Sequence, residues 1–78
     1  MIKVDILSPE GSRHLEADAV FLPGVMGEFE VLRNHAPIIS VLAAGKVKWR
    51  VGEKMDSLEI PGGVVRLKDN AMQICVEI

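Results

Sequence analysis

The sequence predicts an all-β fold, and three observations support that prediction. Apolar and polar residues alternate with a period of two along most of the chain, as they do in strands that face a core on one side and solvent on the other. No segment shows a convincing helical period of 3.6 residues. Turn-forming residues recur every 8 to 12 residues or so, which is the spacing of short strands in a sandwich or barrel.

The first half of the chain contains four segments that the pattern predicts to be extended. In residues 2–6 apolar side chains alternate with Lys3 and Asp5, which is typical of a half-buried strand. This strand should end near Pro9 and Gly11, because proline lacks a backbone donor and glycine permits a turn. The other three segments are residues 15–22, 28–31 and 38–43. The last of these is apolar on both faces, so we expect it to be a central strand of the sandwich.

The second half of the chain alternates more regularly. Residues 46–51 give the clearest strand, with two valines and Trp49 on one face and three basic residues on the other. Residues 52–54 follow as the tip of a hairpin. Three more strands are expected, at residues 58–60, 65–67 and 72–78. They are separated by Pro61-Gly62-Gly63, where we expect a corner with positive backbone φ, and by Asp69-Asn70.

The length of 78 residues allows one domain, which we take to be residues 1–78, without a linker or an internal repeat. A chain this short buries only about 60% of its unfolded surface, so we expect a thin margin of stability. Cys75 is the single cysteine, so no disulfide can form within the chain, and a reducing, cytoplasmic setting fits that count.

Charge and hydropathy exclude two classes of partner. The net charge is −2, and the 9 basic residues are interleaved with 11 acidic ones, so we expect no nucleic-acid surface. Met1 leads directly into an alternating pattern rather than into an apolar leader. The longest apolar stretch, residues 41–44, is far too short to cross a bilayer. Any association with a membrane should therefore go through a partner, without direct insertion.

The residues capable of chemistry form no recognisable site. His14, His35 and Cys75 lack the short spacing that metal ligands show. The same scatter argues against a hydrolytic triad, so we expect no catalytic residue, no metal site and no cofactor. His14 is expected in a solvated polar turn. Cys75 is expected as a small, partly exposed side chain on the outward face of the last strand.

Lys54 suggests an alternative function. It is expected at the tip of a hairpin in a small all-β domain, and biotinyl or lipoyl carrier domains present a modified lysine in such a place. A solvated lysine is also common at a hairpin tip, and Lys54 has a methionine on one side only. A third interpretation is an all-β interaction module of unrelated function.

Val25 and Met26 are apolar residues expected at a loop tip, within the sequence Leu22-Pro-Gly-Val-Met-Gly27. A soluble monomer usually places polar residues at such a tip. Two interpretations are consistent with this: the tip is a docking surface, or it packs under the edge of the sandwich.

Residues 22–45 resemble the signature of the epsilon subunits of F-type ATP synthases. In that family a glycine-bearing loop leads through a short strand to a His-Ala-Pro sequence, which an apolar strand and a glycine follow. The matching positions here are Gly24 and Gly27, residues 35–37, residues 38–42 and Gly45. Residues 4–9 are similar to the family's first strand and residues 60–65 to its Gly-Gly corner, so the resemblance covers nearly the whole chain.

The resemblance implies a flattened β-sandwich of two mostly antiparallel sheets. It also implies a non-catalytic place in the central stalk, between the gamma subunit and the membrane rotor ring of c subunits, where proton- or sodium-driven rotation is transmitted. By position, Ser8 and His35 match residues that lie against the gamma subunit. Glu28 matches a residue of the loop that faces the ring, and Val25 and Met26 would flank it. A peripheral place on the cytoplasmic face of the bacterial inner membrane follows from this.

Two departures from the family pattern limit these expectations. Glu30, Arg33 and Asn34 stand where many relatives have Gly and Pro-Gly, so the turn before His35 should differ. The sequence ends at Ile78, where relatives continue into two C-terminal helices associated with inhibition and, in some members, with ATP binding. We therefore expect neither nucleotide binding nor inhibition from these residues, and the native-looking start favours a naturally short chain.

Overall fold

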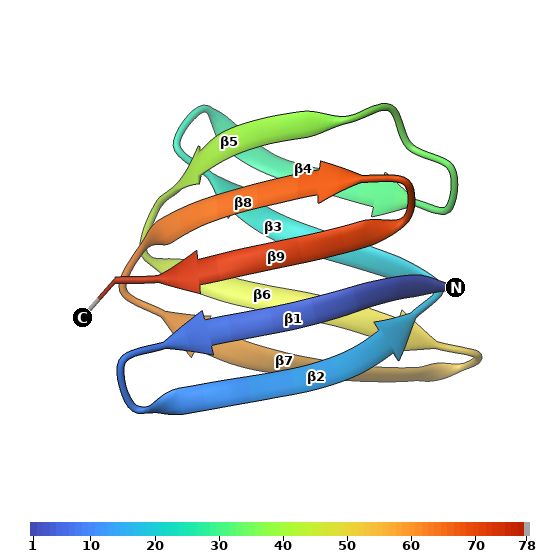
Figure 1. Ribbon diagram of the computed structural model, residues 1–78, viewed down its shortest axis with the longest axis horizontal. Helices are drawn as coiled ribbons and strands as arrows, with labels where there is room; N and C mark the ends of the chain where they lie inside the picture. The colour runs from blue at the N-terminus through green and yellow to red at the C-terminus, as the bar shows by residue number, and fades with distance from the viewer. Residues whose placement is uncertain (78) are drawn as a thin grey trace.

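The computed structural model describes residues 1–77 and contains nine strands, with no helix in that range. The strands are β1 (Ile2–Ser8), β2 (Gly11–Ala17), β3 (Ala19–Gly24), β4 (Gly27–Leu32), β5 (Ile38–Leu42), β6 (Gly45–Val51), β7 (Lys54–Ile60), β8 (Gly63–Lys68) and β9 (Ala71–Val76). The all-β prediction is confirmed, and the strands stack as a β-sandwich (Figure 1). Ile78, which the sequence pattern assigned to the last strand, lies outside the described residues.

The sandwich has two layers, each a ladder of neighbouring strands (Figure 1). The front layer follows the order β2-β1-β9-β8-β5, and the back layer follows the order β4-β3-β6-β7. All pairs are antiparallel except β1 with β9, which run parallel from Lys3↔Ala71 to Leu7↔Cys75. The sandwich is therefore mostly antiparallel, as predicted.

The two layers are parts of one curled sheet rather than two separate sheets. They join where the end of β3 meets the end of β5, through the single pair Gly24↔Leu42. Two backbone hydrogen bonds support the junction: Ala43 N donates to the Pro23 carbonyl at 2.7 Å, and Val25 N donates to the Val41 carbonyl at 3.3 Å. Curling joins the two layers at this edge, so less unpaired backbone is left there.

Alternation along each strand places one apolar face between the layers. The largest fully buried side chains come from both layers, and they are Ile2, Val4, Val20, Leu22, Val31, Val47, Val65, Met72 and Ile74. Burying an aliphatic side chain of this size stabilises the fold by about 1.5–3 kcal/mol. At the β2 and β7 edges, the guanidinium of Arg13 lies 5.1 Å from the ring centroid of the buried Trp49 and 3.6 Å from Asp56 Oδ2.

The prediction of one extended segment over residues 15–22 is wrong in one respect. The chain leaves the front layer at Ala17, at the end of β2, and enters the back layer at Ala19, at the start of β3. Asp18 makes the crossing, and its carboxylate accepts a hydrogen bond from Gly52 N at 2.8 Å. Both alanines are fully buried. Because the backbone is extended on both sides of the crossing, the sequence pattern does not reveal the break.

Residues 38–43 were expected to form a central strand, and that prediction is only partly right. The strand exists as β5 and lies between β8 and β3 in the curled sheet, but it pairs along its length with β8 and meets β3 only through Gly24↔Leu42, so it forms the edge of the front layer. Its outer face is open, so Ile39 and Val41 are 76% and 55% exposed.

His14 lies within β2 and not in a turn as expected. It is exposed as predicted, but its Nδ1 lies 2.6 Å from Asp5 Oδ1 on the neighbouring strand β1. Asp5 and His14 are directly opposite in the β1–β2 register, which explains the contact.

Two turns confirm sequence predictions. At the Gly62-Gly63 corner the backbone of β8 approaches β9 so closely that a Cβ on Gly63 would stand 2.2 Å from the Cys75 carbonyl oxygen, so no other residue fits. Between β8 and β9, Asp69 and Asn70 have φ values of 53° and 59°. A two-residue hairpin loop of type I′ needs this left-handed conformation at both positions, and Asp and Asn tolerate it best after glycine.

Candidate interaction surface

The outer face of the front layer carries a row of side chains without charge. The register sets Val41 beside Val64, Val64 beside Cys75, and Cys75 beside Leu7, so these four residues point outward at the same level of four neighbouring strands. Val41 and Val64 are 55% and 37% exposed, and Cys75 is exposed as the sequence predicted. The next row towards the start of β1 begins with Ile39 and continues with polar residues.

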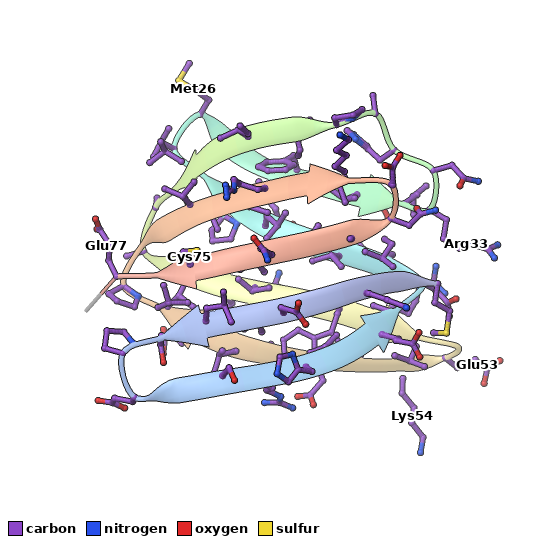
Figure 2. The ribbon with its side chains drawn as sticks, viewed as in Figure 1. Met26, Arg33, Glu53, Lys54, Cys75 and Glu77 are labelled. Carbon is purple, nitrogen blue, oxygen red and sulfur yellow. The ribbon has the colours of Figure 1, made fainter. Side chains whose placement is uncertain are left out.

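The tip of the β3–β4 hairpin extends this row beyond β5. Val25 and Met26 form the turn between Gly24 and Gly27, and they are 58% and 98% exposed. The hydrogen bond from Val25 N to the Val41 carbonyl holds the tip beside β5. Figure 2 shows Met26 projecting from the end of the hairpin, away from the sandwich. Of the two interpretations left open for this tip, packing under the sandwich edge is excluded.

Val25, Met26, Ile39, Val41 and Val64 together form what we call the apolar patch. They are five of the nine large apolar side chains that are exposed among residues 1–77. Single exposed apolar residues are common, but a contiguous group on an edge strand invites association with another chain. The patch is therefore the best candidate for a docking site.

Glu28 lies close to the tip in sequence but on a different face. It is the second residue of β4, and its Oε2 lies 3.4 Å from Lys48 Nζ of β6 on the outer face of the back layer. Of the three residues that the resemblance assigned to the ring, Val25 and Met26 share the hairpin tip, whereas Glu28 points outward from the back layer beside it.

The structure does not bring Ser8 and His35 together. Ser8 ends β1 at the same end of the strands as the hairpin tip, and its hydroxyl donates to the Gly11 carbonyl at 3.1 Å. His35 lies in the loop before β5, at the opposite end of the strands, on the side where Arg33 is labelled in Figure 2. Its exposed ring has Nδ1 2.7 Å from the Ala36 carbonyl oxygen, to which an Nδ1–H would donate.

The loop that carries His35 is attached to the turn between β8 and β9. Asn34 N donates to Asn70 Oδ1 at 2.6 Å, and Asn70 Nδ2 donates back to Asn34 Oδ1 at 3.0 Å. Asn34 has a φ of 63°, a conformation that glycine adopts freely and that asparagine adopts more readily than other residues. The turn before His35 therefore keeps a glycine-like backbone without a glycine. The two hydrogen bonds between Asn34 and Asn70, which are 36 positions apart, hold this turn in place, and we call this pair of residues the asparagine clamp.

The residues considered for covalent modification or metal binding do not gather into one site. Lys54 begins β7 beside the two-residue turn Gly52-Glu53, and its side chain points away from the sandwich (Figure 2). Within residues 1–77 no group of three His, Cys, Asp or Glu side chains is placed to hold a metal ion. A helix capable of crossing a membrane is not found in the same range.

Sequence reasoning missed Ile39, Val41 and Val64 as surface residues. Alternation within residues 38–42 does place Ile39 and Val41 on one face, but a strand with apolar residues on both faces is typical of the middle of a sandwich. Whether another layer covers such a face depends on how distant segments pack, and the pattern of one segment contains no such information.

Comparison with known proteins gives consistent results. A family model described as the β-sandwich domain of the ATP synthase delta/epsilon chain matches residues 1–78. An ATP synthase epsilon chain of Leptospira interrogans is 39% identical over 77 residues, which cover 97% of this chain and 61% of the relative. The epsilon chain of Desulfitobacterium hafniense is 38% identical over 73 residues, covering 92% of this chain and 55% of the relative. The chain thus spans little more than half the length of these curated relatives.

Solved structures share the fold at lower identity. A chain in the central stalk and c-ring structure of the Tetrahymena thermophila mitochondrial ATP synthase superposes with a TM-score of 0.82 at 18% identity, covering 97% of this chain and 63% of that one. A chain in the Euglena gracilis mitochondrial ATP synthase superposes with a TM-score of 0.85 at 22% identity, covering 94% of this chain and 48% of that one. At these identities the likeness concerns the fold.

Proposed function

The chain belongs to the family of the ATP synthase delta/epsilon chain β-sandwich domain, and from that premise we propose that it is the docking domain of a central-stalk subunit of an F-type ATP synthase. In this role it is not an enzyme and binds no cofactor, metal or nucleotide. Residues 1–78 act as one domain that ties the membrane rotor ring of c subunits to the gamma subunit, so that proton- or sodium-driven rotation reaches the catalytic head. The domain is peripheral, on the cytoplasmic face of a bacterial inner membrane.

The observation that carries this proposal is the apolar patch. A partner that covers Val25, Met26 and Val41 removes apolar surface from water, which is the main favourable term in most protein associations. A sandwich of this size also gains stability from docking by mass action, because the partner binds only the folded chain. A non-catalytic coupling role needs this kind of interface and no reacting groups.

The positions of the assigned residues suggest how two partners share the domain. The tip with Val25 and Met26, together with Glu28, faces the ring at one end of the strands. Ser8 and His35 mark opposite ends of the front layer. We place the gamma subunit along the strand direction on the outer face of this layer, over Val41 and Val64, from where it reaches both ends.

A binding titration against the gamma subunit of the same organism tests this arrangement. Val41 of β5 and Met55 of β7 form a matched pair, since each points outward from an edge strand and they are 55% and 53% exposed. Val41→Asp should weaken binding about tenfold or more, because a charge would be buried at an apolar contact, whereas Met55→Asp should change it less than about twofold.

Far-ultraviolet circular dichroism and thermal unfolding check that both variants remain folded. Met26→Asp should leave gamma binding intact and weaken association with isolated ring. The proposal fails if the unmodified chain does not bind the gamma subunit, and the assignment of the face fails if Val41→Asp and Met55→Asp behave alike.

A further inference from the structure

A shallow groove of about 800 Å³ crosses the outer face of the front layer at the end opposite the hairpin tip. One wall is formed by Pro37 and Ile39, from the loop before β5 and from β5 itself. The other wall is formed by Lys3 and Asp5 of β1, and β8 and β9 make the floor. The groove continues the outer face that carries Val41 and Val64, since Ile39 belongs to both surfaces.

The groove is positively charged in a chain of net charge −2. Lys3, Arg66 and Lys68 line it, and none of them takes part in the ion pairs found within residues 1–77. Asp5 is the one carboxylate in the lining, and its Oδ1 is held 2.6 Å from His14 Nδ1. Three cations are thus available to a ligand on a surface that is elsewhere mixed in charge.

The apolar wall of the groove is held in place by the asparagine clamp. The hydrogen bonds between Asn34 and Asn70 attach the loop before β5 to the β8–β9 turn, and Asn70 also accepts a backbone hydrogen bond from Lys3 N at 2.8 Å. Both walls are therefore tied to the same turn. A groove whose walls are already fixed loses little conformational freedom when it is occupied.

Resting on the proposed function, we propose that this groove takes an acidic segment of the stalk partner that covers the front layer. Carboxylates of the segment pair with Lys3, Arg66 and Lys68, and an apolar side chain packs on Pro37 and Ile39. The occupant is a protein rather than an anionic lipid, because the tip assigned to the membrane ring lies at the other end of the strands. Because salt screens pairs of opposite charge at a partly exposed groove, binding to it should be strongest at low ionic strength.

The test compares two double variants that remove the same charge. Arg66→Gln/Lys68→Gln alters the groove, and Lys46→Gln/Lys54→Gln removes two exposed cations elsewhere on the chain. Titrations with the gamma subunit are run at low and at physiological ionic strength. The groove variant should bind about tenfold more weakly at low ionic strength and lose much of its salt dependence, whereas the control should stay within about twofold of the unmodified chain.

Amide chemical shifts provide a second measurement that does not depend on affinity. Adding the gamma subunit should shift the amides of Ala71 and Gln73, which lie in the groove, and leave those of Ser57 and Glu59 on the back layer unchanged. If the unmodified chain binds but both double variants behave alike, the groove proposal is overturned and the proposed function stands. If the unmodified chain does not bind, both are overturned. Sedimentation with phosphatidylglycerol vesicles that depends on Arg66 and Lys68 would also overturn it, in favour of a lipid.

Discussion

The two layers bury similar side chains inward but differ in what they expose. On the front layer, Val41, Val64 and Cys75 lie side by side at one level of the strands, without a charge among them. On the back layer, the corresponding outward position of β3 is Phe21, which lies between Glu30 of β4 and Lys48 of β6. The stems of long charged side chains can cover an aromatic ring of this kind from both sides.

Comparing the two layers shows which apolar residues the fold itself requires and which it does not. The inward residues of both layers must be apolar, because the sandwich has no other core. The outward residues are under no such requirement, so a charged outer face is the ordinary result for a sheet that meets water. The uncharged row on the outer face of the front layer is therefore not required by the fold, and it is the feature on which the proposed docking role rests.

The largest difference in stability is expected between an inward and an outward substitution at neighbouring positions of one strand. Ile74 of β9 is fully buried, and the adjacent Cys75 points outward. Ile74→Ala should lower the free energy of unfolding by about 3 kcal/mol, from lost burial and the cavity that remains. Cys75→Ser should change it by less than about 0.5 kcal/mol, as outward substitutions usually do. Urea denaturation measures both, and similar losses would contradict the division between the two faces.

An intermediate effect is expected at the asparagine clamp, which borders the front layer. Asn70→Ala should lower the free energy of unfolding by about 2 kcal/mol, because it removes two side-chain hydrogen bonds and places alanine, which tolerates a positive φ less well than asparagine does, at a φ of 59°. Asn70→Gly should lower it by about 1 kcal/mol, since glycine adopts that φ without strain. Equal losses in thermal or urea unfolding would show that backbone strain has no part in the effect.

The smallest effect is expected for the ion pair on the back layer. Lys48 Nζ and Glu28 Oε2 are 3.4 Å apart, with side chains that are 41% and 52% exposed. Lys48→Gln should change the free energy of unfolding by about 0.5 kcal/mol or less, because solvent screens such a pair. A loss well above that value would mean that the charged face contributes to the fold as the apolar core does, which would remove the contrast between the layers.

The sequence pattern was sufficient for most of the strands and most of their inward faces, although it did not separate β2 from β3. Ile2, Val4 and Trp49 are buried as alternation predicted, because the period of two belongs to the backbone of a strand and needs no knowledge of its neighbours. The Gly62-Gly63 corner was predictable for the same local reason. The crossing at Asp18 was not, since an extended backbone looks alike whether or not it changes layer.

The candidate surface was only partly predictable. Val25 and Met26 stood out because apolar residues at a turn conflict with a local preference. Ile39 and Val41 did not, because they are exposed on an outer face that no further layer covers, and the absence of such a layer is a property of the whole topology. The pairing of Asn34 with Asn70 joins positions that are 36 residues apart, and no local pattern contains it.

The parallel pairing of β1 with β9 has a mechanical consequence. Tension applied between Ile2 and Val76 pulls the two strands in opposite directions along their length, because the start of β1 and the end of β9 lie at opposite ends of the ladder (Figure 1). The hydrogen bonds between Lys3↔Ala71 and Leu7↔Cys75 then share the load and must break together, whereas a hairpin opens one bond at a time. The two terminal strands therefore resist extension by shear, so the two ends of the described chain should be harder to pull apart than the strands of any hairpin in the sandwich.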